Sequence, residues 1–222
     1  MTLPNALKHA LSVPAIGAPM FLVSFPPLVS ALCRAGVIGA FPHVNARPSE
    51  QLDRWLSEIE ADLRAYKDAH PGAKVAPHAV NLIVHRTNAR YEPDLDIVVA
   101  HKVPLVITCL GDPRRTIEAV HGYGGLVFCD VVNALHARKA IEGGADGLIC
   151  VGGGAGGHAS NQSAFSLVRE VREFWTAAWC WAAASATAIR FAPLKYSAPI
   201  SPIWARAFWP HASRTRRMPT NR

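Results

Sequence analysis

The sequence predicts an α/β fold in which short parallel strands alternate with helices and the sheet closes as a TIM-type (β/α)8 barrel. Before residue 174, six short runs rich in Val, Ile and Leu alternate with six helix-length amphipathic stretches. Parallel neighbours need a crossover connection, usually a helix, so this alternation indicates a parallel sheet. Polar or glycine-rich residues follow several of the runs, which is where barrel enzymes assemble their sites.

The predicted elements follow in a regular order. Strands are expected at 13–20, 37–42, 75–84, 104–110, 126–131 and 147–151. Helices are expected at 27–35, 49–70, 95–102, 114–122, 133–143 and 164–174. The second helix is predicted to begin with a capped turn at Ser49, and Trp55, Ile59 and Leu63 continue an apolar stripe at helical spacing.

An open doubly wound sheet and a closed barrel both fit this alternation. No GxGxxG segment follows the first strand, which weighs against a dinucleotide site of the Rossmann type. Unusual residues instead follow several strands, at Ala18-Pro19-Met20, Asn81, Asp130 and the run from Gly152 to His158. Their distribution over many strand ends favours the barrel.

Length and composition set wide limits on the kind of protein. The 222 residues suit one large domain, and an apolar half excludes a disordered chain. No run reaches the roughly 18 apolar residues of a membrane helix, and no secretory signal is visible at the N-terminus. Five scattered cysteines without CxxC spacing indicate buried thiols in a reducing cytoplasm. The histidines show no ligand spacing such as HExxH, so no metal site is expected.

The composition changes abruptly near residue 174. From there to Arg222 the chain has seven Lys or Arg, no Asp or Glu, five of the six Trp and none of the sixteen Gly. The first 173 residues are neutral, with sixteen basic and sixteen acidic side chains. We therefore expect a barrel at 1–174 and an aberrant basic tail at 175–222. A tail that binds nucleic acid or an anionic membrane is a competing hypothesis, but its Trp residues show no stacking repeat.

The segment from Gly152 to His158 is the sharpest local motif. Five of its first six residues are glycine, which lets the backbone approach an anion or a flat ring closely. His158 is the residue there that can exchange a proton near neutral pH. The competing interpretation is a flexible linker, but linkers rarely follow a buried strand and precede a new helix.

Four segments resemble the nitronate monooxygenase (2-nitropropane dioxygenase) family. They are VPAIGAPMFLVS (13–24), HAVNLIVHRTN (78–88), GLVFCDVVNALHARKAIEGGADGLI (125–149) and VGGGAGGHAS (151–160). The resemblance runs from about residue 11 to 174. It implies an FMN-binding barrel that oxidises alkyl nitronates with O2 to carbonyl compounds and nitrite, with no nucleic-acid or membrane partner.

The resemblance also implies roles for particular residues. His158 is the expected catalytic base. The expected flavin-binding residues are Ala18, Pro19, Met20, Asn81, Asp130, Lys139, Gly153, Gly154, Ala155, Gly156 and Gly157. Each has a structural alternative: Asn81 could end a strand, Asp130 could orient a neighbour, and Lys139 could be a solvated helix residue. Phe25 departs from the small residue expected in the turn before the first helix.

The resemblance stops where a seventh strand should begin, and a shifted reading frame accounts for the break. Codons for 198–210 can be chosen so that another frame reads GADLAYMGTRFLA, which resembles the family's eighth strand and phosphate segment. Codons for 179–188 can likewise give LVLGGGIGDG, which resembles its seventh strand and first phosphate loop. We therefore expect a frameshift near Trp175, a poorly packed tail rich in proline, and a barrel with two unpaired edges.

Two further hypotheses compete with the monooxygenase. FMN-dependent enoyl reductases share a Gly-Gly-His segment, but they need NAD(P)H, whereas a nitronate monooxygenase does not. The chain as written could also be an inactive fragment, because the phosphate-binding loops of the family are missing from its reading frame.

Overall fold

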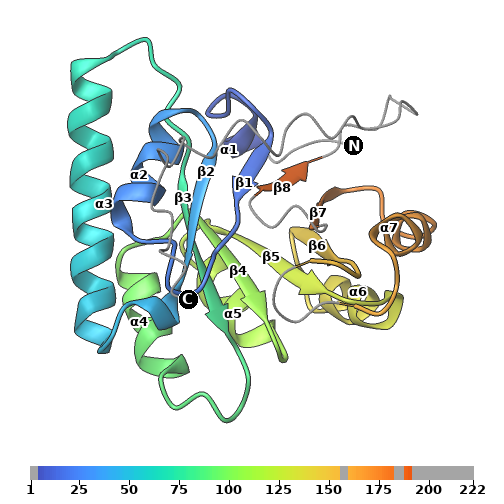
Figure 1. Cartoon of the computed structure of the whole chain (residues 1–222). Helices are drawn as coiled ribbons and strands as arrows, with labels where there is room; N and C mark the ends of the chain where they lie inside the picture. Colours follow the sequence, from blue (N-terminus) through green and yellow to red (C-terminus); the bar gives the residue numbers. More distant parts are fainter. Residues whose placement is uncertain (1–4, 156–159, 183–187, 192–222) are drawn as a thin grey trace, which may run out of the picture.

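The computed structural model shows eight strands whose order closes into a barrel, β1 through β8 (Figure 1). It describes residues 5–155, 160–182 and 188–191. The strands are β1 (Ala15–Gly17), β2 (Ile38–Pro42), β3 (His78–Ile83), β4 (Leu105–Cys109), β5 (Leu126–Val131), β6 (Gly147–Val151), β7 (Ala178–Ala182) and β8 (Ala188–Phe191). The helices are α1 (Asn5–Lys8), α2 (Pro26–Arg34), α3 (Ser49–Ala69), α4 (Tyr91–Ala100), α5 (Arg114–His121), α6 (Ala134–Glu142) and α7 (Ala164–Arg172), with a 3-10 turn, η1 (His43–Asn45).

The first six strands are each followed by a helix, as predicted. Strands β1 to β7 pair in parallel with their neighbours in sequence order. Helices α2 to α4 lie on one side of the curled sheet, and α6 and α7 lie on the other (Figure 1). Among the described residues six strands are followed by a helix, so the six predicted βα units are confirmed, and the barrel is incomplete in having fewer than eight such units.

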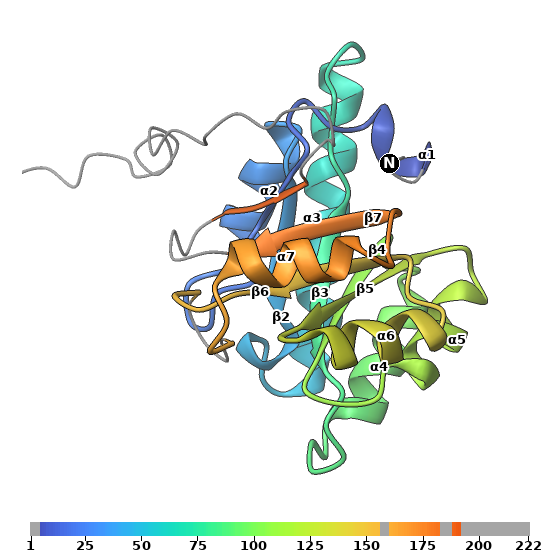
Figure 2. The same cartoon turned by 90° about the vertical axis from the view of Figure 1, so that its right-hand side faces the viewer.

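The prediction of two unpaired barrel edges is wrong. Strand β7 pairs with β6 (Figure 2), and β8 pairs with both β7 and β1 (Figure 1). However, β8 is antiparallel to both neighbours. Five residues separate Ala182 from Ala188, whereas a parallel crossover needs a dozen or more. The connection is thus too short for a parallel crossover, which accounts for the reversed direction of β8.

Side chains alternate between the two faces of each strand. The barrel interior is filled by Ile16, Ile38, Ala79, Ile107, Phe128 and Ile149, with Leu7 and Leu11 closing its amino-terminal end. The other face packs against the helices in a second cluster, which includes Phe41, Val80, Leu82, Val106 and Leu148 of the strands and Leu52, Leu56 and Ile59 of α3. These strands are buried on both faces, which explains their continuous apolar sequences.

Two details of the predicted helices differ. Ser49 is the first residue of α3 and makes no capping hydrogen bond, because Pro48 occupies the cap position. Helix α4 begins at Tyr91, four residues before the predicted start. Its Pro93 lies in the first turn, where the missing N–H has no helical hydrogen bond to lose.

No helix in the described part of the chain is long and apolar enough to cross a membrane.

Candidate functional site

The predicted ligand-binding residues gather at the carboxyl ends of the parallel strands. Ala18 follows β1, Asn81 lies near the end of β3, Asp130 near the end of β5, and Ala155 in the loop after β6. Ala18 and Ala155 are half-buried and both pack against the interior cluster of the barrel. The turn after β1 and the glycine loop after β6 therefore meet at the same end of the barrel.

Asn81, Cys109 and Asp130 form a polar floor inside this end. The Asn81 side chain is 7% exposed, and its Oδ1 accepts a weak hydrogen bond from Cys109 Sγ at 3.8 Å. Its Nδ2 has no partner among the described residues, so one amide donor is left for a ligand. Burial, followed by the charge of Asp130, raises the pKa of Cys109 to about 12. Cys109 is therefore a neutral thiol and not a nucleophile at neutral pH.

Asp130 is the titratable group of this floor. Its position in the strand alternation places it on the interior face, two residues beyond Phe128. Burial raises the pKa of its carboxyl group to about 7. Near neutral pH the group is thus divided between its protonated and ionised forms, and it can donate or accept a hydrogen bond.

The turn at Ala18-Pro19-Met20 is held by side chains that the sequence interpretation missed. Ser24 Oγ donates to the carbonyl of Ala18 at 3.1 Å and accepts from the Met20 N–H at 3.0 Å. Asn45 Nδ2 donates to the carbonyls of Met20 and Ser24, and its Oδ1 accepts from the Leu22 N–H at 2.9 Å. Asn45 thus fixes the loop after β1 from the turn after β2.

A buried hydrogen-bond network supports the loops after β2 and β3. His43 Nδ1 lies 2.5 Å from Asp94 Oδ2, and both side chains are fully buried. Arg90 also pairs with Asp94, at 2.9 Å, and Asn88 Nδ2 lies 3.4 Å from His43 Nε2. Burial opposes ionisation of Asp94, but hydrogen bonds from His43 and Ser49 lower its pKa below the ordinary value. No local sequence pattern predicts the contact between His43 and Asp94, because these residues are 51 positions apart in the chain.

The glycine loop has a defined start. A Cβ at Gly152 would lie 2.4 Å from Ala164 Cα, so only glycine allows α7 to begin this close to β6. Gly154 has φ +87°. The N–H groups of Gly153 and Ala155 are bonded to the carbonyls of Gln162 and Gly152, so neither is free for an anion. The loop thus presents a thin backbone edge, which suits a flat ring.

The remaining predicted residues are placed as follows. Pro19 and Met20 are half-buried in the turn after β1. Lys139 is exposed in the last turn of α6, toward the amino-terminal ends of the strands, and is not brought together with the others. Gly156, Gly157 and His158 lie outside the described residues. Phe25 packs edge-on against Trp55, with ring centroids 5.4 Å apart, so its large side chain is accommodated against α3.

The flavin expected from the sequence fits these residues in part. A half-buried apolar turn, a thin glycine loop, a free amide donor and a protonatable carboxyl group suit a flat heterocycle with carbonyl and nitrogen atoms. The phosphate-binding loops expected after the seventh and eighth strands correspond to residues outside the described part. No group of three or more His, Cys, Asp or Glu that could hold a metal occurs among the described residues.

The fold and the residues at the strand ends together define this chain as a β/α-barrel protein, with its candidate site at the carboxyl ends of the strands. The chain belongs to the nitronate monooxygenase family, whose family model matches residues 5–176. A curated relative, a nitronate monooxygenase of Neurospora crassa, is 32% identical over 180 residues, covering 71% of this chain and 48% of the relative. The chain thus spans about half the length of that relative.

Two solved structures share the fold. FabK from Thermotoga maritima superposes with a TM-score of 0.66 at 23% identity, covering 81% of this chain and 54% of that one. A nitroalkane oxidase from Streptomyces ansochromogenes superposes with a TM-score of 0.64 at 20% identity, covering 79% and 60%. At these identities the likeness establishes the fold alone.

Proposed function

We propose that this chain derives from an FMN-dependent nitronate monooxygenase, which oxidises alkyl nitronates with O2 to carbonyl compounds and nitrite. The observation that carries the proposal is the convergence of Ala18, Asn81, Asp130 and Ala155 at one end of a barrel of this family. FMN, when bound, would supply the redox chemistry, and the protein would supply orientation and electrostatics.

Each converging residue has a part in this proposal. Ala18, Pro19 and Met20 would support the ring from the β1 side, and Gly153 to Gly157 would lie along its edge. Asn81 Nδ2 would donate a hydrogen bond, and Asp130, with its pKa near 7, would donate or accept one. His158 would position the nitronate or take a proton from a neutral nitroalkane. Lys139 would approach the cofactor only if α6 or its side chain moved.

We also propose that residues 175–222 are translated in a shifted reading frame. Three observations support this: the composition breaks near residue 174, the family match ends at residue 176, and β8 runs antiparallel after a five-residue connection. The loops that the family places at the FMN phosphate would then be missing. We expect the chain as written to bind FMN weakly and to have little or no activity.

The partners we propose are a small nitronate and O2, and the location is the cytoplasm. The four described cysteines, Cys33, Cys109, Cys129 and Cys150, are all free thiols, which agrees with a reducing compartment.

Three measurements test the proposal. Resequencing around codon 175 should reveal one nucleotide whose correction restores the family sequence; confirmed DNA without such a frame refutes the frameshift. The corrected protein should release nitrite from propyl nitronate in air, and the Asn81→Leu variant should bind FMN more weakly. Rapid reduction of bound flavin by NADH, without nitrite release, would instead identify the enoyl reductase alternative.

A further inference from the structure

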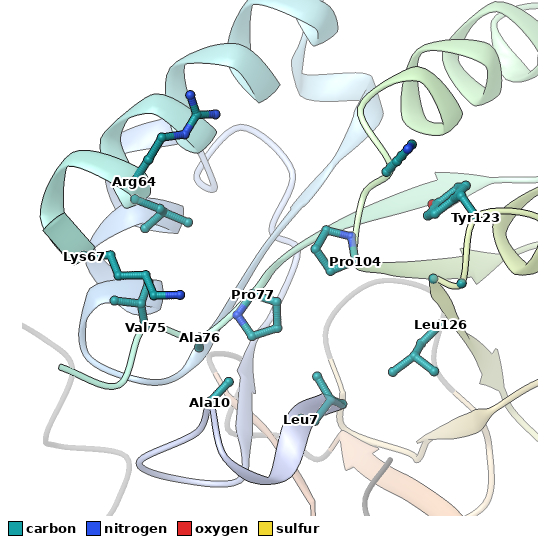
Figure 3. Close-up of a pocket in the computed structure, with 14 residues that line it drawn as sticks. Leu7, Ala10, Arg64, Lys67, Val75, Ala76, Pro77, Pro104, Tyr123 and Leu126 are labelled. Carbon is teal, nitrogen blue, oxygen red and sulfur yellow. The ribbon is translucent and has the colours of Figure 1, made fainter. Parts of the chain in front are cut away.

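A cavity lies at the opposite end of the barrel from the candidate flavin site. It is a surface cavity of about 560 Å³ at the amino-terminal ends of β3, β4 and β5, within the size range of small-molecule pockets (Figure 3). Its walls come from α1, α3 and the loops that enter these three strands. The lining residues used below are Leu7, Pro77, Pro104, Leu126, Lys67 and Lys102.

The charge of this cavity has one sign. Arg64, Lys67 and Lys102 line it, and no Asp or Glu does. Among the described residues, none of these three cations has an ion-pair partner. Lys67 is directed from α3 toward Pro77, so its amino group lies over the apolar floor (Figure 3). An anionic group on a ligand would find its counter-charge here.

The rest of the wall offers little hydrogen bonding. The N–H groups of Ala76, Gly124, Gly125 and Leu126 all donate to backbone carbonyls within the protein. The Tyr123 hydroxyl donates to the carbonyl of Val103 at 2.8 Å. A ligand with a polar body, such as a sugar or a nucleotide, would lose its hydrogen bonds to water without replacing them. The favoured ligand therefore combines one anionic head with an apolar body.

We propose that this cavity binds a medium-chain fatty acid, with its carboxylate attracted by the positive charge of Lys67 and Lys102. The chain lies against Leu7, Pro77, Pro104 and Leu126, whose burial under it supplies the hydrophobic part of the affinity. The basic tail is excluded as the occupant by its charge, because residues 174–222 contain seven Lys or Arg and no acidic residue. The site is independent of the proposed flavin chemistry.

Titration calorimetry of the full 222-residue chain with octanoate, octan-1-ol and octylammonium tests this site. Octanoate should bind saturably, and the other two at least about tenfold more weakly, because they lack the charge that the lysines recognise. The double variant Lys67→Gln/Lys102→Gln should raise the Kd for octanoate about tenfold. The matched control is Lys74→Gln, which neutralises an exposed lysine outside the cavity and should leave the Kd unchanged.

Hydrogen exchange locates the bound ligand. Octanoate should slow exchange in residues 74–77 and 123–126 and leave residues 17–24 at the other end of the barrel unaffected. Equal binding of octanoate and octylammonium, an unchanged Kd in the double variant, or no binding at millimolar octanoate would each overturn the proposal. Protection at residues 17–24 in place of the cavity would overturn it as well.

Discussion

Replacing Asp130 by asparagine should change how stability depends on pH. Burial raises the folded-state pKa of this carboxyl group from 3.8 to about 7. Between these values the folded state holds a proton that the unfolded state has lost, so stability falls as pH rises through this window. A shift of about 3 units corresponds to about 4 kcal/mol, and the partial exposure of Asp130 reduces this to about 2 kcal/mol.

Urea unfolding followed by far-UV circular dichroism measures the effect. The stability difference between the parent chain and Asp130→Asn isolates this carboxyl group: it should shift by about 2 kcal/mol against the parent between pH 4 and pH 7 and level off above pH 7. Glu118→Gln, which neutralises an exposed carboxylate on α5, is the matched control. Parallel pH profiles for the parent and Asp130→Asn would refute the inference that this carboxyl group is protonated near neutral pH.

Three other variants test further parts of the structure. Asn45→Ala removes three hydrogen bonds to the loop after β1, so amide hydrogen exchange at Leu22 should accelerate at least about tenfold. An unchanged exchange rate would show that the loop is ordered without Asn45. Gly152→Ala should cost about 3 kcal/mol in urea unfolding, because its Cβ meets the backbone of Ala164. Burial, and to a lesser extent His101, lowers the pKa of His78 to about 4, so the contribution of this group to stability should fall by about 3 kcal/mol from pH 6.5 to pH 4. His78→Gln should remove that loss, and an equally steep fall in this variant would assign the loss to other groups.

Strand positions could be predicted because the strands are buried on both faces. The runs at 126–131 and 147–151 match β5 and β6 residue for residue, since apolar sequence ends where a barrel strand leaves the core. The start of α4 was missed because Pro93 resembles a helix breaker unless its place in the first turn is known. Strand β1 is shorter than the predicted run at 13–20, so local pattern located the elements better than it located their ends.

The positioning network of the site could not be predicted in the same way. Asn45 contacts a loop more than twenty residues earlier, and His43 meets Asp94 on another helix. A polar residue after a strand carries no local sign of such a distant partner. Asn81 and Asp130 could be selected from sequence because they interrupt apolar runs near strand ends. A polar side chain is costly to bury there, so its presence suggests a functional role.

The direction of β8 decides what the end of this chain can contribute to the site. Ala188 pairs with Gly17 at the carboxyl end of β1, and Arg190 pairs with Ala15 at the other end. The chain therefore leaves β8 at the amino-terminal face of the barrel, whereas a parallel eighth strand would leave it at the face that carries Asn81 and Asp130. A phosphate loop directly after β8 would thus begin at the wrong end of the barrel. Restoring a connection of crossover length should reverse β8 and tighten FMN binding together, because both depend on the same segment.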